Sequence, residues 1–375
     1  MSDAPWRITL ADVSIGAEER AAVDEVLRSG WLSMGPETER FEQAFAAYVG
    51  AEHAVAVTNG TAALHLAAAA LGLGPGDEVI CPALTFVASA AGMRQAGADV
   101  RLADSTSLED FAIDPAELER LASPATRAVV VLHYGGFPAD MESILAVAER
   151  RGWFVIEDAA HAPGARLGEA ACGTIGDAGC FSFFPNKNMT TGEGGMVVLR
   201  DATVAARARS LRSHAMTTMT WDRHRGHAAS YDVVDVGFNY RIDELRAALG
   251  RVQLSRLDDL NAARERVTGW YRELLAGAAG VSLPGLGGRG TPSYHLAPVV
   301  ASSLEARDRL REHLRAERIQ TSVHYPAIHR FRHYASEHGL PNAEAIADRT
   351  LTLPLHPGLS REDVEAVCAA LLEAS

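Results

Sequence analysis

The sequence lacks the cysteine pairs, the long apolar runs and the basic excess that mark several common classes of protein. Its four cysteines, Cys81, Cys172, Cys180 and Cys368, form no C-x-x-C pair. We expect them to be small buried residues in a reducing compartment, and we expect no metal site.

Membrane, secretory and nucleic-acid-binding proteins are disfavoured for related reasons. The most apolar stretch, LHLAAAALGLG, is far shorter than a membrane span and contains His65. The first residues, MSDAPWRITLADVSIG, have neither a basic start nor an apolar core, so we expect no signal peptide. The net charge of −13 leaves no basic excess for nucleic acid or an anionic membrane surface. The sequence therefore predicts a cytoplasmic protein whose partners are neither nucleic acid nor membrane.

What the sequence does contain, from about residue 53 to 200, is an alternation of short apolar runs with alanine-rich segments. HAVAVTNG, DEVICPA, DVRLAD, RAVVVLHYG and WFVIEDAA are typical of strands, and TAALHLAAAALGL, TFVASAAGMRQAG and DMESILAVAERRG lie between them as helices. This order predicts βαβ units and an α/β fold with a mostly parallel sheet covered by helices on both faces. Only a loop joins DAGCFSFF to GGMVVLRD, so these two strands form either an antiparallel pair or an insertion without a helical crossover.

The C-terminal third has a different pattern. Residues 243–276 contain no proline and have apolar spacing near 3.6, which predicts one long helix or two in tandem. Beyond a glycine- and proline-rich stretch, YHLAPVVA and IQTSVHYP are expected to be strands, and SLEARDRLREHLRAE and SREDVEAVCAALLEA helices. We therefore expect a large domain over residues 1–245, followed over 246–375 by the long helix and a small α+β domain.

Ligands of parallel α/β sheets bind at the carboxyl ends of the strands, and two loops there suit a phosphorylated ring. In TNGTAAL, Gly60, Thr61 and Ala62 offer amides and a hydroxyl at a helix N-terminus, an arrangement that binds phosphate. An ordinary N-cap would give the same pattern. In PALTFVASA, Phe86 could stack on a planar ring, or it could be a core aromatic residue.

Two further strand ends carry charged groups. FVIEDAAHAPGA ends a strand in Glu157 and Asp158, which must point to opposite faces, and His161 follows. A protonated ring nitrogen would pair with a buried aspartate, although a capping aspartate and a core histidine are the alternative. Lys187 follows Ser182 and precedes the tight turn TTGEGG. Partial desolvation would lower the pKa of this lysine and make it a nucleophile, whereas a solvated hairpin lysine is the alternative.

Together these four features are the parts needed to hold pyridoxal 5′-phosphate. The lysine would bind the cofactor covalently, and the aspartate would keep its ring nitrogen protonated so that the ring acts as an electron sink. A nucleotide is disfavoured because GTAAL is neither a G-x-G-x-x-G nor a Walker A loop.

The sequence resembles the DegT/DnrJ/EryC1/StrS family of sugar aminotransferases that depend on pyridoxal phosphate, within the fold-type I aspartate aminotransferase superfamily. The resemblance runs nearly from end to end. It lies in SGWLSMGPETERFEQAFAAYVGAEHAVAVTNGTAALHLA, GPGDEVICPALTFVASA, EDAAHAPGA, FSFFPNKNMTTGEGGMV, GFNYRIDELRAALG and LPLHPGLSREDVEAV. It implies a seven-stranded type of sheet and a homodimer with shared active sites.

The resemblance also implies roles for single residues. Lys187 would be the covalent lysine and general acid and base, Asp158 the partner of the pyridine nitrogen, and His161 a neighbour of the ring and its 3-hydroxyl. Phe86 would stack on the ring. The phosphate would be bound by Thr61, Ala62 and Ser182 next to Gly60, and by Asn239 of the neighbouring subunit.

The expected substrate residues are less closely tied to motifs. Arg241 of GFNYR is a candidate for substrate anions, and His324 of IQTSVHYP is a further candidate. His214 and Arg223 lie in RSHAMTTMTWDRHRGHAASYDVV, which we interpret either as a loop near the acceptor site or as a solvated basic loop. The chain departs from the family at Arg246, where glutamine is more usual, and at Phe184, where histidine is more usual. We place both on the substrate side.

The resemblance implies a ping-pong transamination in which L-glutamate converts the cofactor to pyridoxamine phosphate and a ketosugar takes the amine. The TTGEGG turn is similar to members that aminate a nucleotide-linked 4-keto-6-deoxyhexose. An aminotransferase for a keto-cyclitol in aminoglycoside-type biosynthesis would use the same residues. A sugar dehydratase is disfavoured because dehydratases of this kind carry histidine in place of Lys187. A non-catalytic regulatory protein would not need Lys187, Asp158 and Ser182 together.

Overall fold

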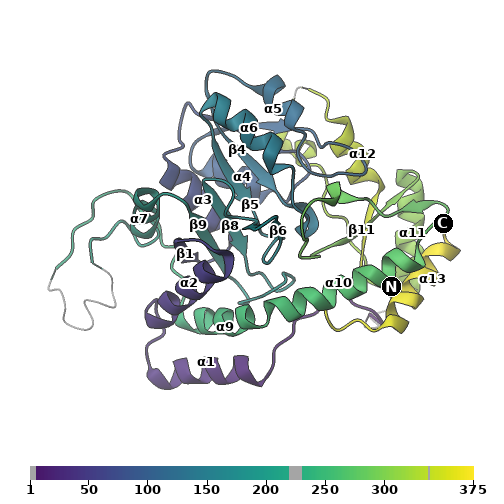
Figure 1. Cartoon of the computed structure of the whole chain (residues 1–375), viewed down its shortest axis with the longest axis horizontal. Helices are drawn as coiled ribbons and strands as arrows, with labels where there is room; N and C mark the ends of the chain where they lie inside the picture. The colour runs from purple at the N-terminus through teal and green to yellow at the C-terminus, as the bar shows by residue number, and fades with distance from the viewer. Residues whose placement is uncertain (1–5, 219–229, 337) are drawn as a thin grey trace.

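The computed structural model describes residues 6–218, 230–336 and 338–375 (Figure 1). Its helices are α1 (Ala17–Ser29), α2 (Pro36–Val49), α3 (Gly60–Leu71), α4 (Ala88–Gln95), α5 (Pro115–Leu121), α6 (Met141–Arg151), α7 (Ala202–Leu211), α9 (Glu244–Ser255), α10 (Leu257–Leu274), α11 (Leu304–Ala316), α12 (Pro341–Arg349) and α13 (Arg361–Glu373). Its strands are β1 (His53–Val57), β2 (Glu78–Pro82), β3 (Asp99–Ala103), β4 (Thr126–Leu132), β5 (Phe154–Asp158), β6 (Arg166–Leu167), β7 (Ala170–Ala171), β8 (Ala178–Ser182), β9 (Gly195–Leu199), β10 (Val281–Ser282), β11 (Ala297–Ala301) and β12 (Thr350–Leu353).

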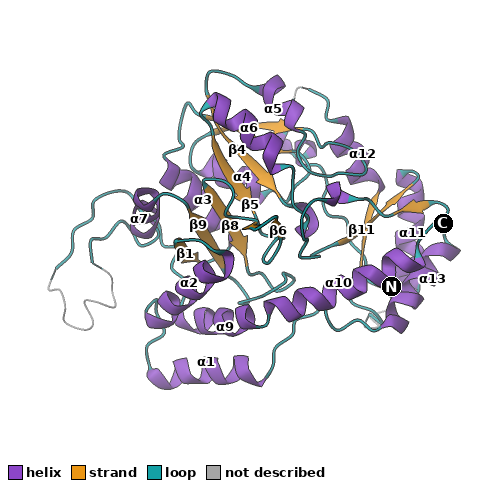
Figure 2. Cartoon of the chain, in the orientation of Figure 1, coloured by secondary structure: helices purple, strands orange, loops and turns teal. Residues whose placement is uncertain are grey.

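The largest sheet of the described chain has seven strands in the order β1-β9-β8-β5-β4-β2-β3. Strand β9 is antiparallel to both β1 and β8, and every other neighbouring pair is parallel. The predicted mostly parallel sheet is therefore confirmed. The pair that the sequence left open, β8 and β9, is antiparallel, as a link without a crossover helix allows. Figure 2 shows the sheet at the centre with helices around it.

Both faces of this sheet are covered, because successive side chains of its strands point to opposite sides. In β4, Val129 and Val131 pack in a layer with α5 and α6, whereas Val130 packs in the layer of α3 and α4. Near the other edge, β1, β9 and β8 pack against α2 and α9. The sheet is thus buried on both sides, and its carboxyl edge is where loops can form a site.

A second, three-stranded antiparallel sheet, β10-β11-β12, forms with the C-terminal helices. The strand expected in IQTSVHYP is wrong, because the chain there makes only isolated bridges, from Ile319 to Ile8 and from Ser322 to Thr352. Strand β12 takes the expected place in the sheet, and its residues TLTL are all buried. Residues 323–326 instead leave the sheet, and Pro326 could not donate a ladder hydrogen bond there.

The long helical segment is two helices in tandem, α9 and α10, which meet at Arg256. Helix α9 packs against α1 and α2, and α10 packs against α13. The boundary expected between residues 245 and 246 falls in the first turn of α9, and we keep the division into a large and a small domain as a proposal.

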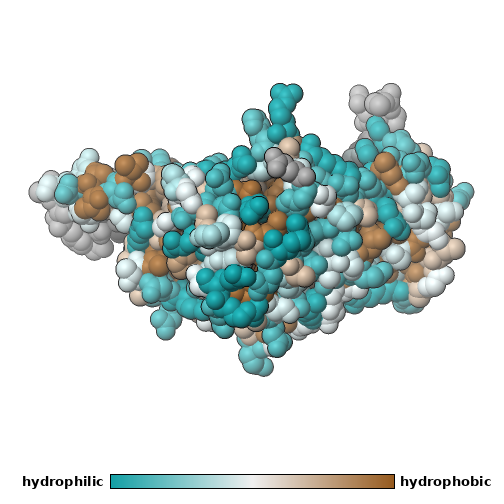
Figure 3. All heavy atoms as spheres, turned by 90° about the horizontal axis from the view of Figure 1, so that it is seen from above, coloured by the Kyte–Doolittle hydropathy of each residue, from teal (hydrophilic) through white to brown (hydrophobic). Residues whose placement is uncertain are grey.

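The described parts of the chain between α7 and α9, residues 212–218 and 230–243, extend to one side of the body of the molecule (Figure 1). The second of these stretches carries a run of exposed apolar residues near its start, Tyr231, Val233, Val234 and Val236. Apolar colour also gathers at this end of the molecule in Figure 3. In the part of the chain that the structure describes, no helix is long and apolar enough to cross a membrane.

Candidate active site

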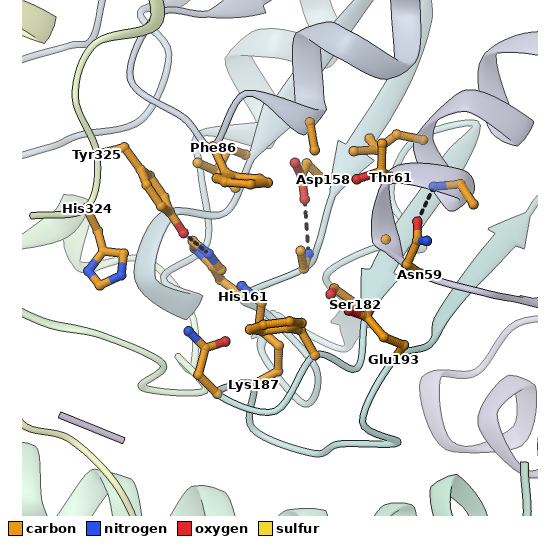
Figure 4. A pocket seen from close by; sticks show the side chains of 18 of the residues that line it. Asn59, Thr61, Phe86, Asp158, His161, Ser182, Lys187, Glu193, His324 and Tyr325 are labelled. Carbon is orange, nitrogen blue, oxygen red and sulfur yellow. Dashed lines mark hydrogen bonds between the residues drawn. The ribbon is translucent and has the colours of Figure 1, made fainter. Parts of the chain in front are cut away.

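A cavity of about 650 Å³ opens at the carboxyl edge of the central sheet. The loops after β1, β2, β5 and β8 line it on one side, and His324 and Tyr325 line it on the other (Figure 4). The four strand ends chosen from the sequence therefore meet at one place. Gly60, Thr61, Ala62, Phe86, Asp158, His161, Ser182 and Lys187 all line the cavity.

The start of α3 and the end of β8 form the wall of the cavity that carries Gly60 and Ser182. A side chain at position 60 would place its Cβ 2.8 Å from Cβ of Ser182, so only glycine allows these two segments to lie so close. Asn59 Oδ1 accepts the Ala62 amide at 2.8 Å and caps the helix. The capping function and the phosphate cradle are compatible, because the amides of Gly60 and Thr61 precede the capped one. The Ala62 amide itself is occupied by Asn59.

The end of β5 places two carboxylates in different environments, as the alternation of strand side chains requires. Glu157 is fully buried away from the cavity, and it accepts hydrogen bonds from the amides of Gly173, Ile175 and Gly176 and from His133 Nε2, at 2.6–2.8 Å. The Ala139 amide donates to His133 Nδ1, so Nε2 carries the ring proton. Glu157 is therefore a structural anchor.

Asp158 lines the cavity with fewer partners. Its Oδ2 accepts from the Ser89 hydroxyl at 2.5 Å, and its Oδ1 accepts from the Ala160 amide at 3.2 Å. Thr85 Oγ1 lies 2.7 Å from the Ser89 hydroxyl and supports it from behind. Burial raises the pKa of Asp158, and the bond from Ser89, the Ala160 amide and the charge of Lys187 oppose that rise. A carboxylate can accept about four hydrogen bonds, so Asp158 keeps capacity for a cationic partner in the cavity.

Lys187 projects into the cavity from the turn between β8 and β9. The turn is tight, since the Lys187 amide donates to the Phe184 carbonyl at 2.9 Å and Thr191 returns a backbone bond to Phe183. Burial lowers the pKa of Lys187 to about 8, against the opposing effect of Asp158. About a tenth of this amine is neutral at pH 7, far more than for an ordinary lysine, and the neutral form is the one that a nucleophile requires. Sequence reasoning passed over one signal: Lys187 is the only lysine among the 35 lysine and arginine residues of the chain.

Two aromatic residues face the cavity from opposite segments of the site. Phe86 is 55% exposed and Phe184 46% exposed, although both are large and apolar, whereas Phe183 is fully buried against Phe41 and Phe45. An exposed ring on a cavity wall is available for stacking on a planar ligand. The prediction that Phe86 is only a core aromatic residue is thus disfavoured.

His161, in the loop after β5, lies across from His324 and next to Tyr325. His161 Nδ1 accepts from the Gly135 amide at 3.2 Å, and its Nε2 lies 2.9 Å from the Tyr325 hydroxyl. Burial, followed by the charges of Lys187 and His324, holds the pKa of His161 well below its ordinary value. Burial and Lys187 also lower the pKa of His324 to about 4. Both histidines are therefore neutral at neutral pH.

Several predicted residues do not join this group within one chain. Asn239, Arg241 and His214 do not line the cavity of their own chain, and Asn239 and His214 are exposed. Burial, and then Arg212, lowers the pKa of Arg241. Arg223 lies outside the described residues. Among the described residues that line the cavity there is no arginine.

Other lining residues were missed from the sequence, namely Asn59, Asn186, Glu193, Tyr240 and Tyr325. Tyr240 and Tyr325 lie beside Asn239 and His324, in the motifs already quoted, so their neighbours were a usable signal. Asn186 is next to Lys187, and its buried Oδ1 has no hydrogen-bond partner among the described residues. An unpaired buried oxygen beside the lysine indicates room for a polar ligand group.

The arrangement fits pyridoxal 5′-phosphate. The glycine-dependent cradle at Gly60 suits the phosphate, the exposed Phe86 ring suits the pyridine face, and Asp158 with its spare capacity suits the ring nitrogen. The sole lysine of the chain enters from the remaining side. Fold and site together define an enzyme of the fold-type I class that depends on pyridoxal phosphate.

Comparison with known proteins agrees with this class of enzyme. Residues 13–372 match the DegT/DnrJ/EryC1/StrS aminotransferase family, and the chain belongs to it. It is 42% identical to the spore coat polysaccharide biosynthesis protein SpsC of Bacillus subtilis (strain 168), over 95% of this chain and 94% of that protein. It is 41% identical to the GDP-perosamine synthase of Caulobacter vibrioides, over 99% of both. The crystal structure of DesV from S. venezuelae, in complex with a ketimine intermediate, has a TM-score of 0.88 at 38% identity and covers 95% of this chain and 94% of its own.

These findings confirm the resemblance, the fold class, the cofactor and the enzyme class expected from the sequence. The chain is a sugar aminotransferase that uses pyridoxal 5′-phosphate.

Proposed function

We propose that the enzyme moves an amino group from L-glutamate to a nucleotide-linked ketosugar, with a 4-keto-6-deoxyhexose as the acceptor. The observation that carries the acceptor class is the near-complete alignment, at 41% identity, with a protein named GDP-perosamine synthase. SpsC, which is named as a polysaccharide biosynthesis protein, adds support for sugar chemistry on the same scaffold. The keto-cyclitol alternative has no comparable support from these relatives.

In the proposed mechanism Gly60, Thr61 and Ser182 would bind the cofactor phosphate, Phe86 would stack on its ring, and Asp158 would hold the ring nitrogen protonated. The bound cofactor supplies an electron sink that makes the carbon next to the substrate nitrogen acidic. Lys187 Nζ would take the proton from that substrate carbon and hold it for its return. The pKa of about 8 allows Lys187 Nζ to take up and release this proton near neutral pH.

We further propose that the active enzyme is a homodimer that completes each site. Among the described residues, the cavity lining of one chain offers no arginine, whereas the donor carries two carboxylates and the proposed acceptor carries phosphates. Asn239 and His214 are exposed on the described stretches between α7 and α9 that also carry Val233, Val234 and Val236. In a second copy these apolar residues would contact the partner, and Asn239, Arg241 and His214 would reach its cavity. A cytoplasmic location stays a prediction from the sequence.

A panel assay tests the acceptor. The enzyme loaded with cofactor would be incubated with L-glutamate and, separately, nucleotide-linked 4-ketosugars, 3-ketosugars and keto-cyclitols, and the amine product measured by mass. We expect 2-oxoglutarate and amino sugar in equal amounts with a nucleotide-linked 4-keto-6-deoxyhexose. Amination of a keto-cyclitol alone would overturn the proposal. Asp258→Asn is the matched control. It alters an exposed hydrogen bond with Tyr48 outside the cavity, so it should leave product formation with every acceptor unchanged.

A further inference from the structure

The residue after Lys187, Asn188, is buried, and its side chain makes three hydrogen bonds within the protein. Its Nδ2 donates to Asn261 Oδ1 at 2.7 Å and to the Ser293 carbonyl at 2.6 Å. Its Oδ1 lies 3.0 Å from His295 Nδ1. Asn188 is 3% exposed and does not line the cavity, so a ligand would not replace these bonds. Asn188 thus fixes the chain immediately next to the lysine that lines the cavity (Figure 4).

The orientation of the Asn188 amide follows from the groups around it. The Ser293 carbonyl can only accept, so Asn188 Nδ2 must point toward it. Asn261 Nδ2 donates to the Pro163 carbonyl at 3.0 Å, which leaves Asn261 Oδ1 to accept from Asn188. Asn188 Oδ1 therefore faces His295 and needs a donor there, so His295 carries a proton on Nδ1. Burial holds the pKa of His295 well below its ordinary value, and the ring is neutral with this one tautomer.

Two partners of Asn188 also hold His161, in the loop after β5. The Ser293 hydroxyl donates to the His161 carbonyl at 2.9 Å, and the ring of His295 packs on the ring of His161 with centroids 4.5 Å apart. The backbone amides of Ser293 and His295 donate to the carbonyls of residues 136 and 135, at 3.0 and 2.8 Å. Both partners are therefore fixed by their main chain as well as by their side chains.

The third partner, Asn261, connects the same loop to helix α10. Its bond to the Pro163 carbonyl lies next to Gly164, which has a φ of +88°. A side chain on Gly164 would place its Cβ 2.4 Å from Asn261 Nδ2, so the loop and the helix fit closely there. Through Asn188 the turn that carries Lys187 is thus bonded to three groups that each hold the loop after β5.

Other bonds of the turn between β8 and β9 lead to different segments. The Thr190 hydroxyl donates to the Phe183 carbonyl at 3.0 Å, and the Thr190 amide donates to Gln253 Oε1 of α9 at 3.3 Å. Neither bond reaches the loop after β5. Loss of the Asn188 side chain should therefore change where Lys187 lies relative to that loop, while the turn stays attached to β8 and α9.

We propose that Asn188 is a positioning residue that sets the place of Lys187 Nζ in the cavity, and that it acts together with His295, whose Nδ1 fixes the Asn188 oxygen. Lys187 keeps its place beside the reacting carbon because the next residue is bonded to the segments that also hold His161. The inference rests on the proposed role of Lys187. It extends that role to two residues that do not line the cavity.

The first test uses Asn188→Ala, which removes all three bonds. The pH midpoint for reductive methylation of Lys187 would be measured in the apoprotein by peptide mass mapping. Burial lowers the pKa of Lys187, so an amine displaced toward water should titrate at higher pH, and we expect a rise of about one pH unit. In the holoenzyme the half-reaction with saturating L-glutamate should slow by at least about tenfold, with KM for L-glutamate within about twofold of the parent. A midpoint within about 0.2 units of the parent overturns the proposal, and so does an unchanged rate.

Two amide variants of His295 test its part in the proposal. In His295→Asn the side-chain amide nitrogen lies near the place of Nδ1 and can still donate to Asn188 Oδ1. In His295→Gln that nitrogen lies near the place of Nε2, so the bond is lost. Both variants lose the ring that packs on His161, so this change is matched. We expect the Lys187 midpoint to stay within about 0.3 units of the parent in His295→Asn and to rise in His295→Gln. Equal midpoints in the two variants would contradict the role of His295.

Asn342→Ala is the matched control. The Asn342 amide also donates to two oxygens, the carbonyls of Ser105 and Thr106 at 2.9 and 3.1 Å, and it does not line the cavity. It should leave the Lys187 midpoint and the half-reaction unchanged. A midpoint shift as large as that of Asn188→Ala would show a general effect of lost bonds, contrary to the proposal.

Two features of the design keep the outcome interpretable. The melting temperature of each variant identifies a folding defect, and if Asn188→Ala does not fold, the two His295 variants decide the proposal. The methylation uses the apoprotein and needs neither acceptor nor turnover. Failure of every ketosugar to react would therefore refute the proposed acceptor, whereas the role of Asn188 is decided by the Lys187 midpoint.

Discussion

Glu157 and Asp158 are adjacent in the chain, yet they lie on opposite sides of the central sheet in opposite kinds of surroundings. Glu157 accepts hydrogen bonds from three backbone amides and His133, and none of its atoms faces the cavity. Asp158 accepts one hydroxyl and one amide, and it lines the cavity near Lys187. Glu157 therefore contributes to the stability of the fold, whereas Asp158 is available for the chemistry of the site.

This difference shows how a buried carboxylate can be interpreted. A fully bonded carboxylate stabilises the segments that bond it, here the turn at residues 173–176 and the chain after β4. A carboxylate with unused acceptor capacity at a cavity wall is available to a ligand. Substitution of Glu157 should therefore mainly lower the free energy of unfolding, and substitution of Asp158 should mainly lower turnover.

The largest effect is expected from Lys187→Ala. Turnover should fall by at least about 1,000-fold, because the variant loses both the nucleophile and the general acid and base. The chain has no other lysine to replace it. Steady-state assays with L-glutamate and acceptor check this, with the unfolding free energy as the control. Retention of more than a tenth of the turnover would contradict the assigned role.

Glu157→Gln should have its main effect on stability. A glutamine amide would place donors against the donors of His133 and Gly173, so we expect the free energy of unfolding to fall by about 3 kcal/mol. Urea denaturation of the apoprotein measures the change. The folded variant should keep turnover within about threefold of the parent, because no atom of Glu157 faces the ligand. If Glu157→Gln kept its stability and lost its activity, the structural role assigned to Glu157 would be wrong.

Asp158→Asn should show the reverse pattern. We expect turnover to fall by about 100-fold, because an amide cannot hold the cofactor nitrogen protonated. The free energy of unfolding should change by less than about 1 kcal/mol, since the variant removes a charge that burial disfavours. Parallel kinetics and urea denaturation of the Glu157 and Asp158 variants give the direct contrast. An equal fall in the free energy of unfolding of the two variants would contradict the different roles assigned to Glu157 and Asp158.

The smallest effect concerns the pH dependence of Lys187 in the apoprotein. Its pKa of about 8 predicts half-maximal reductive methylation near that pH, well below the range of an ordinary lysine. Because the Asp158 charge raises this pKa, Asp158→Asn should move the midpoint to lower pH, and Glu157→Gln should leave it in place. Peptide mass mapping separates Lys187 from the N-terminal amine. A midpoint unaffected by Asp158→Asn would show that the two groups do not interact.

The sheet and the grouping of the strand-end residues could both be predicted from the sequence. The βαβ pattern dictates parallel strands, and parallel strands bring their carboxyl ends together, so Gly60, Phe86, Asp158 and Lys187 could be placed near one another before any contact was known. The opposite orientations of Glu157 and Asp158 followed from the two-residue period of a strand.

The far side of the cavity could not be predicted in the same way. Tyr325 reaches the site from a segment that leaves the second sheet, and IQTSVHYP has the composition of a strand although it forms none. Its position depends on long-range bonds to Thr352 and Tyr134, which no local pattern reveals. The hydrogen bonds of the two carboxylates likewise depend on groups distant in the chain, the amides of residues 173–176 for Glu157 and the Ser89 hydroxyl for Asp158.

The central claim, that the cavity side of the sheet holds the cofactor on Lys187, is tested most directly by borohydride reduction of the purified holoenzyme. Tryptic digestion and mass spectrometry would then locate the product. We predict one reduced cofactor per chain, in a peptide of residues 167–200 that trypsin no longer cuts after Lys187. An unmodified Lys187, or a cofactor mass found only on the N-terminal amine, would contradict the account.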